Sequence, residues 1–177
     1  RLPGEGKVRI SGRGDLEGMI DFNVEGRVPA AGITPLLEDI GEAWGMLGLE
    51  AGIRGTISAP EIRGSITLDR AGLVLPVLEQ RLENIQGRID LTPGTMSLVD
   101  IRGEIEGSSV SLAGKVNMEG FRPGTLDVTA AARSLPLEIP GTLRVVVDSD
   151  LTLTGSFEKQ LLRGEVTLIE GIYTRDV

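Results

Sequence analysis

The stretch that decides the fold is Leu16-Glu17-Gly18-Met19-Ile20-Asp21-Phe22-Asn23-Val24-Glu25-Gly26-Arg27-Val28. Every second residue, counted from Leu16, is apolar or glycine, and the residues between them are polar or charged except Met19. Alternation with a period of two is typical of a β-strand that buries one face and exposes the other. The stretch therefore predicts strand, with glycines placed on its apolar face.

The same five-residue pattern, apolar-x-Gly-x-apolar, recurs from one end of the chain to the other. Its copies begin at Leu16, Val24, Ile53, Ile62, Ile85, Ile101, Leu112, Leu153 and Leu162. A glycine inside a strand weakens the strand, so its repetition needs a reason. Glycine relieves crowding between side chains on the concave side of a tightly curved sheet, or it marks a local bulge. The regular placement favours curvature.

Short turn sequences separate the strands at the spacing of a meander, which favours antiparallel neighbours. The turns are predicted at Gly12–Asp15, Ala59–Glu61, Thr92–Gly94, Glu106–Ser109 and Arg122–Gly124. The spacing from Gly55 to Gly64 equals that from Gly155 to Gly164, and the second glycine of each pair follows an arginine. This long-range echo predicts a repeated strand-pair unit.

One region departs from the strand pattern. Thr34 and Pro35 form a typical helix start, and Leu36, Leu37, Ile40 and Trp44 fall on one helical face. The sequence therefore predicts a short amphipathic helical insertion near 34–47. The fold class that we expect is all-β, a curved antiparallel meander folded into a β-taco or open groove with an aliphatic interior, plus this helix.

Length and composition bound the protein class. The 177 residues suffice for one domain, 1–177, and the start at Arg1 suggests a piece of a longer chain. Hydrophobic residues make up 40% but aromatic residues only 3%, so the core is expected to be Leu, Ile, Val and Ala. The net charge of −8 speaks against binding to nucleic acid or to anionic membrane surfaces.

The chemistry of an enzyme is missing from the sequence. Histidine and cysteine are both absent, so no triad can be built on them and the commonest metal ligands are lacking. We therefore expect no catalytic residue, no cofactor and no metal. Asp148-x-Asp150 lacks the other elements of a calcium loop and is interpreted as a polar turn.

The apolar face is the remaining candidate for function. A curved sheet covers such a face with a second layer, closes into a barrel, or leaves a groove. A sheet folded over like a taco shell would leave an aliphatic trough suited to acyl chains. A fully packed sandwich or barrel core without ligand space stays open as the alternative.

The repeated strands resemble the TamB family, the inner-membrane-anchored subunit of the translocation and assembly module. The resemblance rests on Leu151-Thr152-Leu153-Thr154-Gly155 and on Leu162-Arg163-Gly164-Glu165-Val166-Thr167-Leu168-Ile169-Glu170-Gly171-Ile172-Tyr173. The family's C-terminal region carries similar "L-x-L-x-G … L-x-G-x-V-x-L-x-x-G-x-Y" lines. The run from Gly55 to Leu68 is of the same type.

The resemblance implies a β-taco groove in the periplasm of a diderm bacterium, in a parent chain anchored in the inner membrane. It implies a BamA-like outer-membrane barrel as partner, and phospholipid acyl chains as cargo. No catalytic residue carries over. The lipid-binding groove would be lined by Ile57, Ile66, Leu68, Ile89, Ile105, Leu112, Val116, Val128, Leu143, Val145, Val147, Leu153, Phe157, Val166 and Leu168.

Three functions follow as hypotheses. The first is a groove segment that conducts phospholipid between the two membranes and supports outer-membrane biogenesis. The second is a chaperone-like module that binds outer-membrane β-barrel proteins by edge-strand β-augmentation. The third is a passive structural spacer or a secreted β-solenoid. We also expect that exposed edges could pair with a second copy of the chain.

Overall fold

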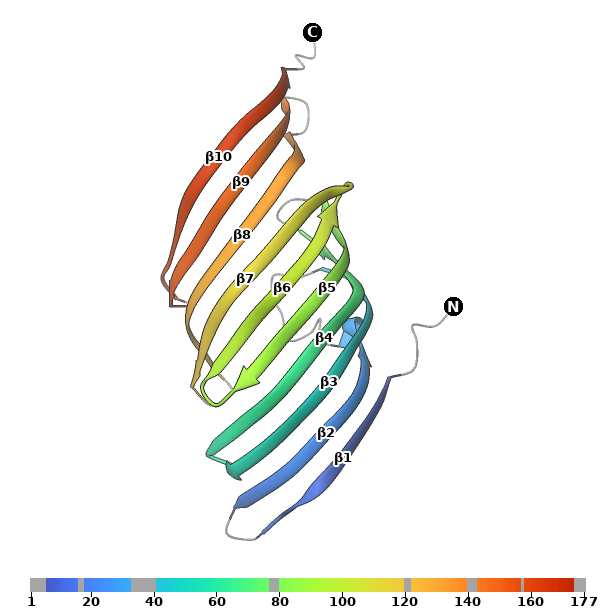
Figure 1. The fold of residues 1–177 in the computed structure, drawn as a ribbon, viewed down its shortest axis with the longest axis vertical. Helices are drawn as coiled ribbons and strands as arrows, with labels where there is room; N and C mark the ends of the chain where they lie inside the picture. The colour runs from blue at the N-terminus through green and yellow to red at the C-terminus, as the bar shows by residue number, and fades with distance from the viewer. Residues whose placement is uncertain are drawn as a thin grey trace.

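The structure, a computed structural model, describes residues 6–15, 18–32, 41–76, 80–119, 122–139, 143–156 and 158–173. Within these ranges ten strands form a single sheet whose spatial order equals the chain order (Figure 1). Each strand pairs antiparallel with the next. The predicted all-β antiparallel meander is confirmed.

The strands are 8 to 18 residues long, and most of the connections between them are short. Their bounds are β1 Lys7–Gly14, β2 Met19–Pro29, β3 Ala43–Thr56, β4 Ala59–Leu75, β5 Gln80–Thr92, β6 Thr95–Ile105, β7 Ser108–Glu119, β8 Arg122–Ile139, β9 Leu143–Ser156 and β10 Gln160–Tyr173. A one-turn 3-10 helix, η1, covers Ala30–Gly32. Among the described residues, no helix is long and apolar enough to cross a membrane.

The predicted helical insertion near 34–47 is wrong at its C-terminal end. Residues 34–40 lie outside the described part of the chain, but β3 begins at Ala43, and Trp44 pairs with Gly72 of β4. Apolar residues spaced as on a helix also suit a strand, and here the pairing with β4 overrides the local preference. Trp44 lies beside Gly72 and stacks under Arg81, whose Cζ is 4.8 Å from the ring centroid.

The predicted turns are partly confirmed. The β5–β6 and β6–β7 hairpins turn at Pro93–Gly94 and Glu106–Gly107. The turn predicted at Ala59–Glu61 is wrong, because the chain turns at residues 57–58 and β4 already begins at Ala59. Pro60 is tolerated there since proline is accepted at the start of a strand.

The predicted repeat of a strand pair is confirmed by the register. In the β3–β4 hairpin Gly55 lies opposite Pro60 and Gly64 opposite Ala51. The β9–β10 hairpin places Gly155 opposite Gln160 and Gly164 opposite Leu151, at the same relative positions. The strands of the two hairpins therefore pair in the same register.

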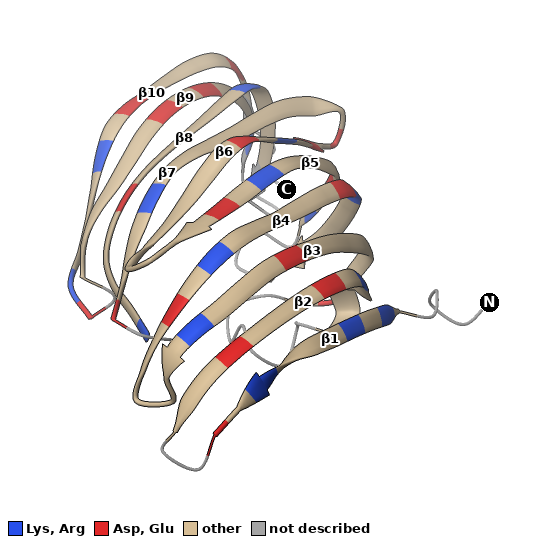
Figure 2. Ribbon diagram, turned by 60° about the horizontal axis from the view of Figure 1, so that its bottom comes forward, with Lys and Arg blue, Asp and Glu red and all other residues tan. Residues whose placement is uncertain are grey.

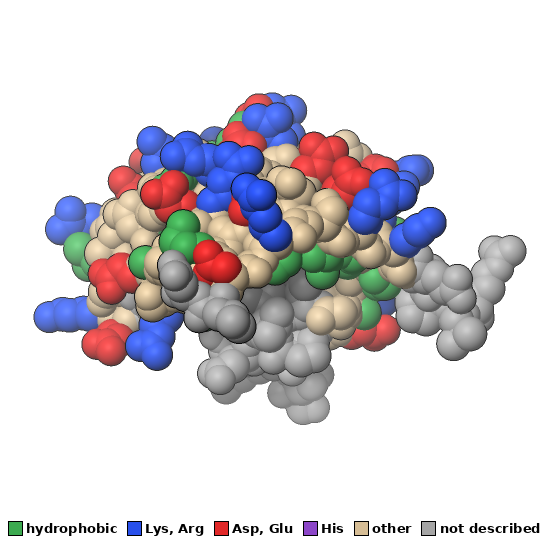
Figure 3. Space-filling view, turned by 90° about the horizontal axis from the view of Figure 1, so that it is seen from below, with side chains coloured by type: hydrophobic (Ala, Val, Ile, Leu, Met, Phe, Trp, Pro, Cys, Tyr) green, Lys and Arg blue, Asp and Glu red, His purple; other side chains and the backbone are tan. Residues whose placement is uncertain are grey.

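The sheet bends over along its strands and forms an open arch (Figure 2). Seen from one end, charged side chains cover the convex side, and hydrophobic side chains lie on the hollow side (Figure 3). This separation follows from the period-two alternation, because side chains at successive positions of a strand point to opposite faces.

A line of β-bulges marks the bend. Arg70, Asn84, Asp100 and Ser134 have positive φ angles and lie in β4, β5, β6 and β8, each at a shift in register. A bulge bends its strand and increases the local twist. The residue that follows each bulge is buried in the core: Ala71, Ile85, Ile101 and Leu135. The core therefore lies along the crease of the sheet.

At several of the repeated glycines the main chain of a neighbouring strand approaches closely. The register runs past Gly114 and Gly164 without a shift, so the bulge interpretation is wrong at these positions. Gly114 has a φ of +148°, and a Cβ there would collide with the backbone of Asp127 and Val128 in β8. At Gly114 glycine therefore avoids the main chain of the neighbouring strand, whereas at Gly72 and Gly103 a Cβ would meet the side chains of Trp44 and Leu82.

Candidate functional site

The candidate site is an apolar row that crosses the whole sheet on its hollow side. Cross-strand partners project to the same face, so the register links one residue of every strand into this row. Its members, from β1 to β10, are Val8, Gly26, Leu49, Ile66, Ile89, Leu98, Gly114, Val128, Leu153 and Leu162. We call the surface formed by this row and its inner-face neighbours the trough.

The length of the trough can be worked out from strand spacing. Nine intervals of about 4.8 Å give roughly 43 Å along the long axis of the molecule. An acyl chain spans about half of a hydrocarbon core of ~30 Å, or about 15 Å. The trough is therefore longer than one acyl chain.

The trough is filled in its middle and exposed at both ends. Two buried clusters lie along the crease, one around Ile85 and Ile101 and the other around Ile105 and Val147. At β10, in contrast, the inward residues Leu162, Val166 and Leu168 are 60%, 58% and 62% exposed. Val8 and Ile10 of β1 are 41% and 66% exposed, so the accessible apolar surface lies toward both ends.

One side of the trough is braced by a contact across the β6–β7 hairpin. The Gln80 Nε2 of β5 donates a hydrogen bond of 2.9 Å to the carbonyl oxygen of Pro136 in β8. Leu75 and Leu137, from β4 and β8, pack against the same buried cluster. This contact ties together strands that do not pair with each other.

Most of the predicted groove residues lie on the inner face in register. The described ones are Ile66, Leu68, Ile89, Ile105, Leu112, Val116, Val128, Val145, Val147, Leu153, Val166 and Leu168. Three of them, Ile105, Val116 and Val147, are buried in the core. Lipid binding by the whole set stays a prediction.

Three predicted groove residues are not found on the inner face of a strand. Ile57 lies in the β3–β4 turn and is 71% exposed, because the strand ends before it. Its backbone N–H donates to the carbonyl oxygen of Gly18, 3.1 Å away, which holds the turn against the β1–β2 loop. Phe157 and the side chain of Leu143 lie outside the described residues.

Sequence reasoning missed the crease, although a signal for it exists. At each bulge the alternation breaks, and apolar residues stand three positions apart instead of two. The pairs are Leu68 and Ala71, Leu82 and Ile85, Leu98 and Ile101, and Ala132 and Leu135. A bulge adds one residue to the strand, so the apolar face resumes one position later.

The Asp148-x-Asp150 step was predicted as a polar turn, and this is wrong, because both residues lie in β9. An Asp148 carboxylate oxygen accepts a hydrogen bond of 2.7 Å from the backbone N–H of Ser134, the bulge residue of β8. Asp150 accepts one of 2.7 Å from Arg133, and this bond raises the pKa of the Arg133 guanidinium. The two carboxylates thus fasten the β8 bulge.

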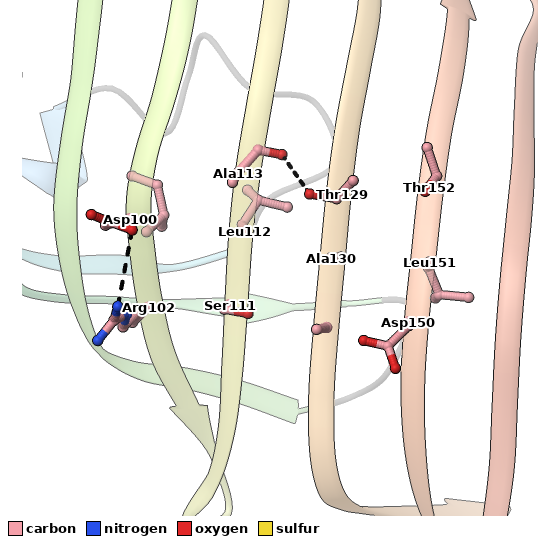
Figure 4. Close-up of a pocket in the computed structure, with 12 residues that line it drawn as sticks. Asp100, Arg102, Ser111, Leu112, Ala113, Thr129, Ala130, Asp150, Leu151 and Thr152 are labelled. Carbon is pink, nitrogen blue, oxygen red and sulfur yellow. Dashed lines mark hydrogen bonds and ion pairs between the residues drawn. The ribbon is translucent and has the colours of Figure 1, made fainter.

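The convex face carries a shallow polar hollow over β6 to β9 (Figure 4). It forms because the side chains of Ser111, Ala113 and Ala131 are small. Asp100 and Arg102 form an ion pair of 3.9 Å at its margin and are both highly exposed. No group of three or more potential metal ligands occurs in the described ranges. The hollow offers neither a buried charge nor an enclosed wall, so the trough remains the better candidate.

Comparison with known protein families gives a match in the C-terminal part of the chain. Residues 97–177 match the family model of the TamB C-terminal domain. The resemblance to the TamB family is therefore confirmed for this region, which contains β7 to β10 and most of β6.

One further protein is similar to a larger part of the chain. Protein TIC236, chloroplastic, of Arabidopsis thaliana is 26% identical over an alignment of 126 residues, and the match covers 67% of this chain. The matched region covers 6% of the length of that protein. No solved structure matches the chain.

Proposed function

We propose that the chain is a non-enzymatic groove segment that conducts phospholipid between the inner and outer membranes and supports outer-membrane biogenesis. The observation that carries this proposal is the apolar row, which crosses all ten strands without a charged residue. The TamB match over residues 97–177 supports the same setting.

The chemistry of the trough suits a moving acyl chain. Apolar contact is non-directional and contributes about 0.8 kcal/mol per buried CH₂ group. Eight of the ten residues of the row are Val, Leu or Ile and the other two are glycine, so no position offers a polar group that would hold the acyl chain more tightly than the next. The headgroup would stay at the open side, in water.

The proposed setting is the periplasm of a diderm bacterium, with the parent chain anchored in the inner membrane. Its proposed partner is a BamA-like barrel in the outer membrane. Among the described residues no polar or charged side chain is buried, so all charges face water on the convex side or at the rims. Such a segment could stand in an aqueous compartment while shielding an acyl chain.

Native mass spectrometry of the purified chain, with organic extraction of bound material, tests the proposal. We expect near-stoichiometric phospholipid on the wild type and its loss in Leu168→Asp. Leu168 is exposed, so the charge enters the trough without opening the core. Leu161→Asp is the matched control, because Leu161 lies on the same strand but on the opposite face and is 48% exposed.

A second assay follows transfer of a fluorescent phospholipid from donor to acceptor vesicles. Leu168→Asp should lower the transfer rate to the protein-free level, and Leu161→Asp should transfer at the wild-type rate. A clean apo mass for the folded wild type, or equal transfer by both variants, would overturn lipid conduction through this face.

A second candidate function is favoured by the exposure of β10. Among the described strands β10 pairs only with β9, and its residues are exposed from Gln160 to Gly171. An exposed edge can accept a strand of an unfolded outer-membrane barrel protein by β-augmentation.

Proline substitution tests this candidate. Backbone groups of successive residues in an edge strand point alternately toward and away from the neighbouring strand. Of Glu165→Pro and Val166→Pro, only the variant whose lost N–H points away from β9 should abolish binding of a barrel-strand peptide while the sheet stays folded. Peptide binding by both variants would exclude this edge as the client site.

A further inference from the structure

One wall of the sheet is notched at the β6–β7 hairpin. This hairpin turns at Glu106–Gly107, whereas the strands on either side of it run further. β5 begins at Gln80, two residues beyond Leu82, which pairs with Ile105 at the end of β6. On the other side β8 runs on to Ile139, well past the residues that pair with β7. The notch is therefore an internal feature of the sheet, with strands on both sides of it.

The strands that flank the notch converge beyond the hairpin. Three strand intervals separate β5 from β8, which is about 14 Å in a flat sheet. The Gln80 Nε2 nevertheless donates a hydrogen bond of 2.9 Å to the carbonyl oxygen of Pro136. One side chain bridges the gap, so the sheet curls enough to bring β5 against β8. We call this contact, together with Leu75 and Leu137 that pack on the same buried cluster, the seam.

The edge of β8 at the notch is blocked against pairing with another strand. Pro136 has no N–H to donate, and proline is one of the means by which proteins protect a strand edge. Side chains occupy two carbonyl oxygens there, since Ser108 Oγ donates to that of Ser134 at 2.7 Å and Gln80 donates to that of Pro136. Among the described residues no backbone hydrogen bond joins β5 to β8. The two flanks of the notch are therefore in contact without being paired.

The polar part of the seam contributes little to closing it. The Gln80 Oε1 is buried and has no hydrogen-bond partner in the part of the chain that the structure describes. A typical hydrogen bond contributes modestly to stability, whereas a buried acceptor left unpaired costs about as much or more. The Gln80 amide therefore loses at its oxygen what it gains at its nitrogen, and opening the seam would let water reach Oε1. Closure rests on the apolar packing.

The packing behind the seam is continuous with the rest of the core. Ile105, Leu135 and Val147 are buried there. Leu82 packs against this cluster and also against the second buried cluster, around Ile85. Parting the seam would therefore open a way from the side into the middle of the trough.

We propose that the seam is a lateral gate, which opens when β5 parts from β8 about the β6–β7 hairpin and admits an acyl chain to the middle of the trough. The passage of lipid rests on the proposed function, whereas the opening itself does not. A gate accounts for flanks that meet without pairing. A fully paired wall would bury the same cluster, but it would part only by breaking a ladder of backbone hydrogen bonds.

Labelling of single cysteines tests the opening without any lipid, because the chain has no cysteine of its own. Val147 lies behind the seam, and Val116 is the matched control, since the two are 6% and 5% exposed. A maleimide should label Val147→Cys about tenfold faster than Val116→Cys in native buffer, because local opening needs less free energy than global unfolding. Equal rates would overturn the gate, since both thiols would then react only through global unfolding.

A charge at Gln80 tests which contact holds the gate. Adding Gln80→Glu should speed the labelling of Val147→Cys several-fold, because a carboxylate cannot donate to the Pro136 carbonyl oxygen and is repelled by it. Gln86→Glu is the matched control, since Gln86 is exposed on the same strand, and it should leave the rate unchanged. An unchanged rate with Gln80→Glu, or an equal rise at Val116→Cys, would overturn the role of Gln80 in the gate.

Locking the seam tests the passage of lipid. Gln80→Cys with Leu137→Cys, bridged by a reducible bis-maleimide, should hold β5 against β8. Transfer of a fluorescent phospholipid between vesicles of phosphatidylethanolamine and phosphatidylglycerol should fall to the protein-free level in the bridged protein and recover on reduction. Ser97→Cys with Lys115→Cys gives the control bridge, because these residues lie opposite each other in β6 and β7. That bridge should leave transfer unchanged.

The two assays separate the gate from the groove. Normal transfer by the protein bridged across the seam would overturn passage through the gate and leave the proposed groove intact. A wild type that transfers no lipid would overturn the proposed function, while fast labelling of Val147→Cys would still establish the opening.

Discussion

Substituting a single glycine tests why the repeated pattern folds as it does. Gly114 lies inside β7, opposite Leu98 and Val128, with a φ of +148°. In Gly114→Ala the new Cβ would lie 2.6 Å from the Cα of Val128 and closer still to the carbonyl oxygen of Asp127. We expect strong destabilisation, because neither contact can be relieved by rotating a side chain.

The magnitude has two parts. A non-glycine residue in a sparsely populated backbone region costs about 1–3 kcal/mol. Forcing extra atoms against packed structure costs about 1–3 kcal/mol more. The free energy of unfolding should therefore fall by roughly 2–6 kcal/mol, the sum of these two ranges.

Gly52→Ala is the matched control. Gly52 lies inside β3, but a Cβ there would meet Asn23 at 3.5 Å and Arg63 at 3.9 Å, which are ordinary contacts. This variant should be unchanged or more stable by about 0.4–1 kcal/mol, because alanine restricts the unfolded chain. Urea unfolding followed by circular dichroism measures both. Equal stability of the two variants would refute the explanation that Gly114 is required by the close main chain of β8. If only residues larger than alanine at position 114 lowered the stability, crowding between side chains would be the better explanation.

Two further predictions concern the crease. Ile105→Ala should lower the free energy of unfolding by about 2–5 kcal/mol, because Ile105 is 3% exposed. Ile57 lies in a turn, so Ile57→Ala should change the free energy of unfolding by less than about 0.5 kcal/mol. Similar losses for the two variants in thermal or urea unfolding would contradict the placement of the core. Asp148→Ala removes the acceptor of the Ser134 N–H and should cost about 1 kcal/mol, with faster amide exchange at Ser134 by NMR; unchanged exchange there would show that the bulge holds without Asp148.

Much of the fold could be predicted because its signal is local. The pleat fixes the period of two, so alternation in Leu16–Val28 and its relatives identifies strands and their inner faces without knowledge of neighbours. The hairpin at Pro93–Gly94 is equally local. The match of Gly55 and Gly64 to Gly155 and Gly164 also carries over directly, because equal spacing in two hairpins gives equal register.

The wrong predictions lie where contacts with other strands determine the local structure. Trp44 suits a helix locally but lies in a strand because β4 supplies its partner. The Asp148-x-Asp150 pattern predicts a turn, yet both residues lie in β9 and their carboxylates bond to the bulge of β8. Ile57 satisfies the repeat but falls just beyond the end of its strand.

The sequence by itself determined the meander, its aliphatic inner face and the lack of histidine and cysteine chemistry, because alternation and composition need no tertiary contact. Only the tertiary structure decided which apolar residues are core and which are accessible. Val116 and Val166 stand in similar patterns, but Val116 lies between two paired strands and is buried, and Val166 lies on the edge and is 58% exposed. Burial depends on the bend of the sheet and on the number of neighbours, and both are set by strands far away in the chain.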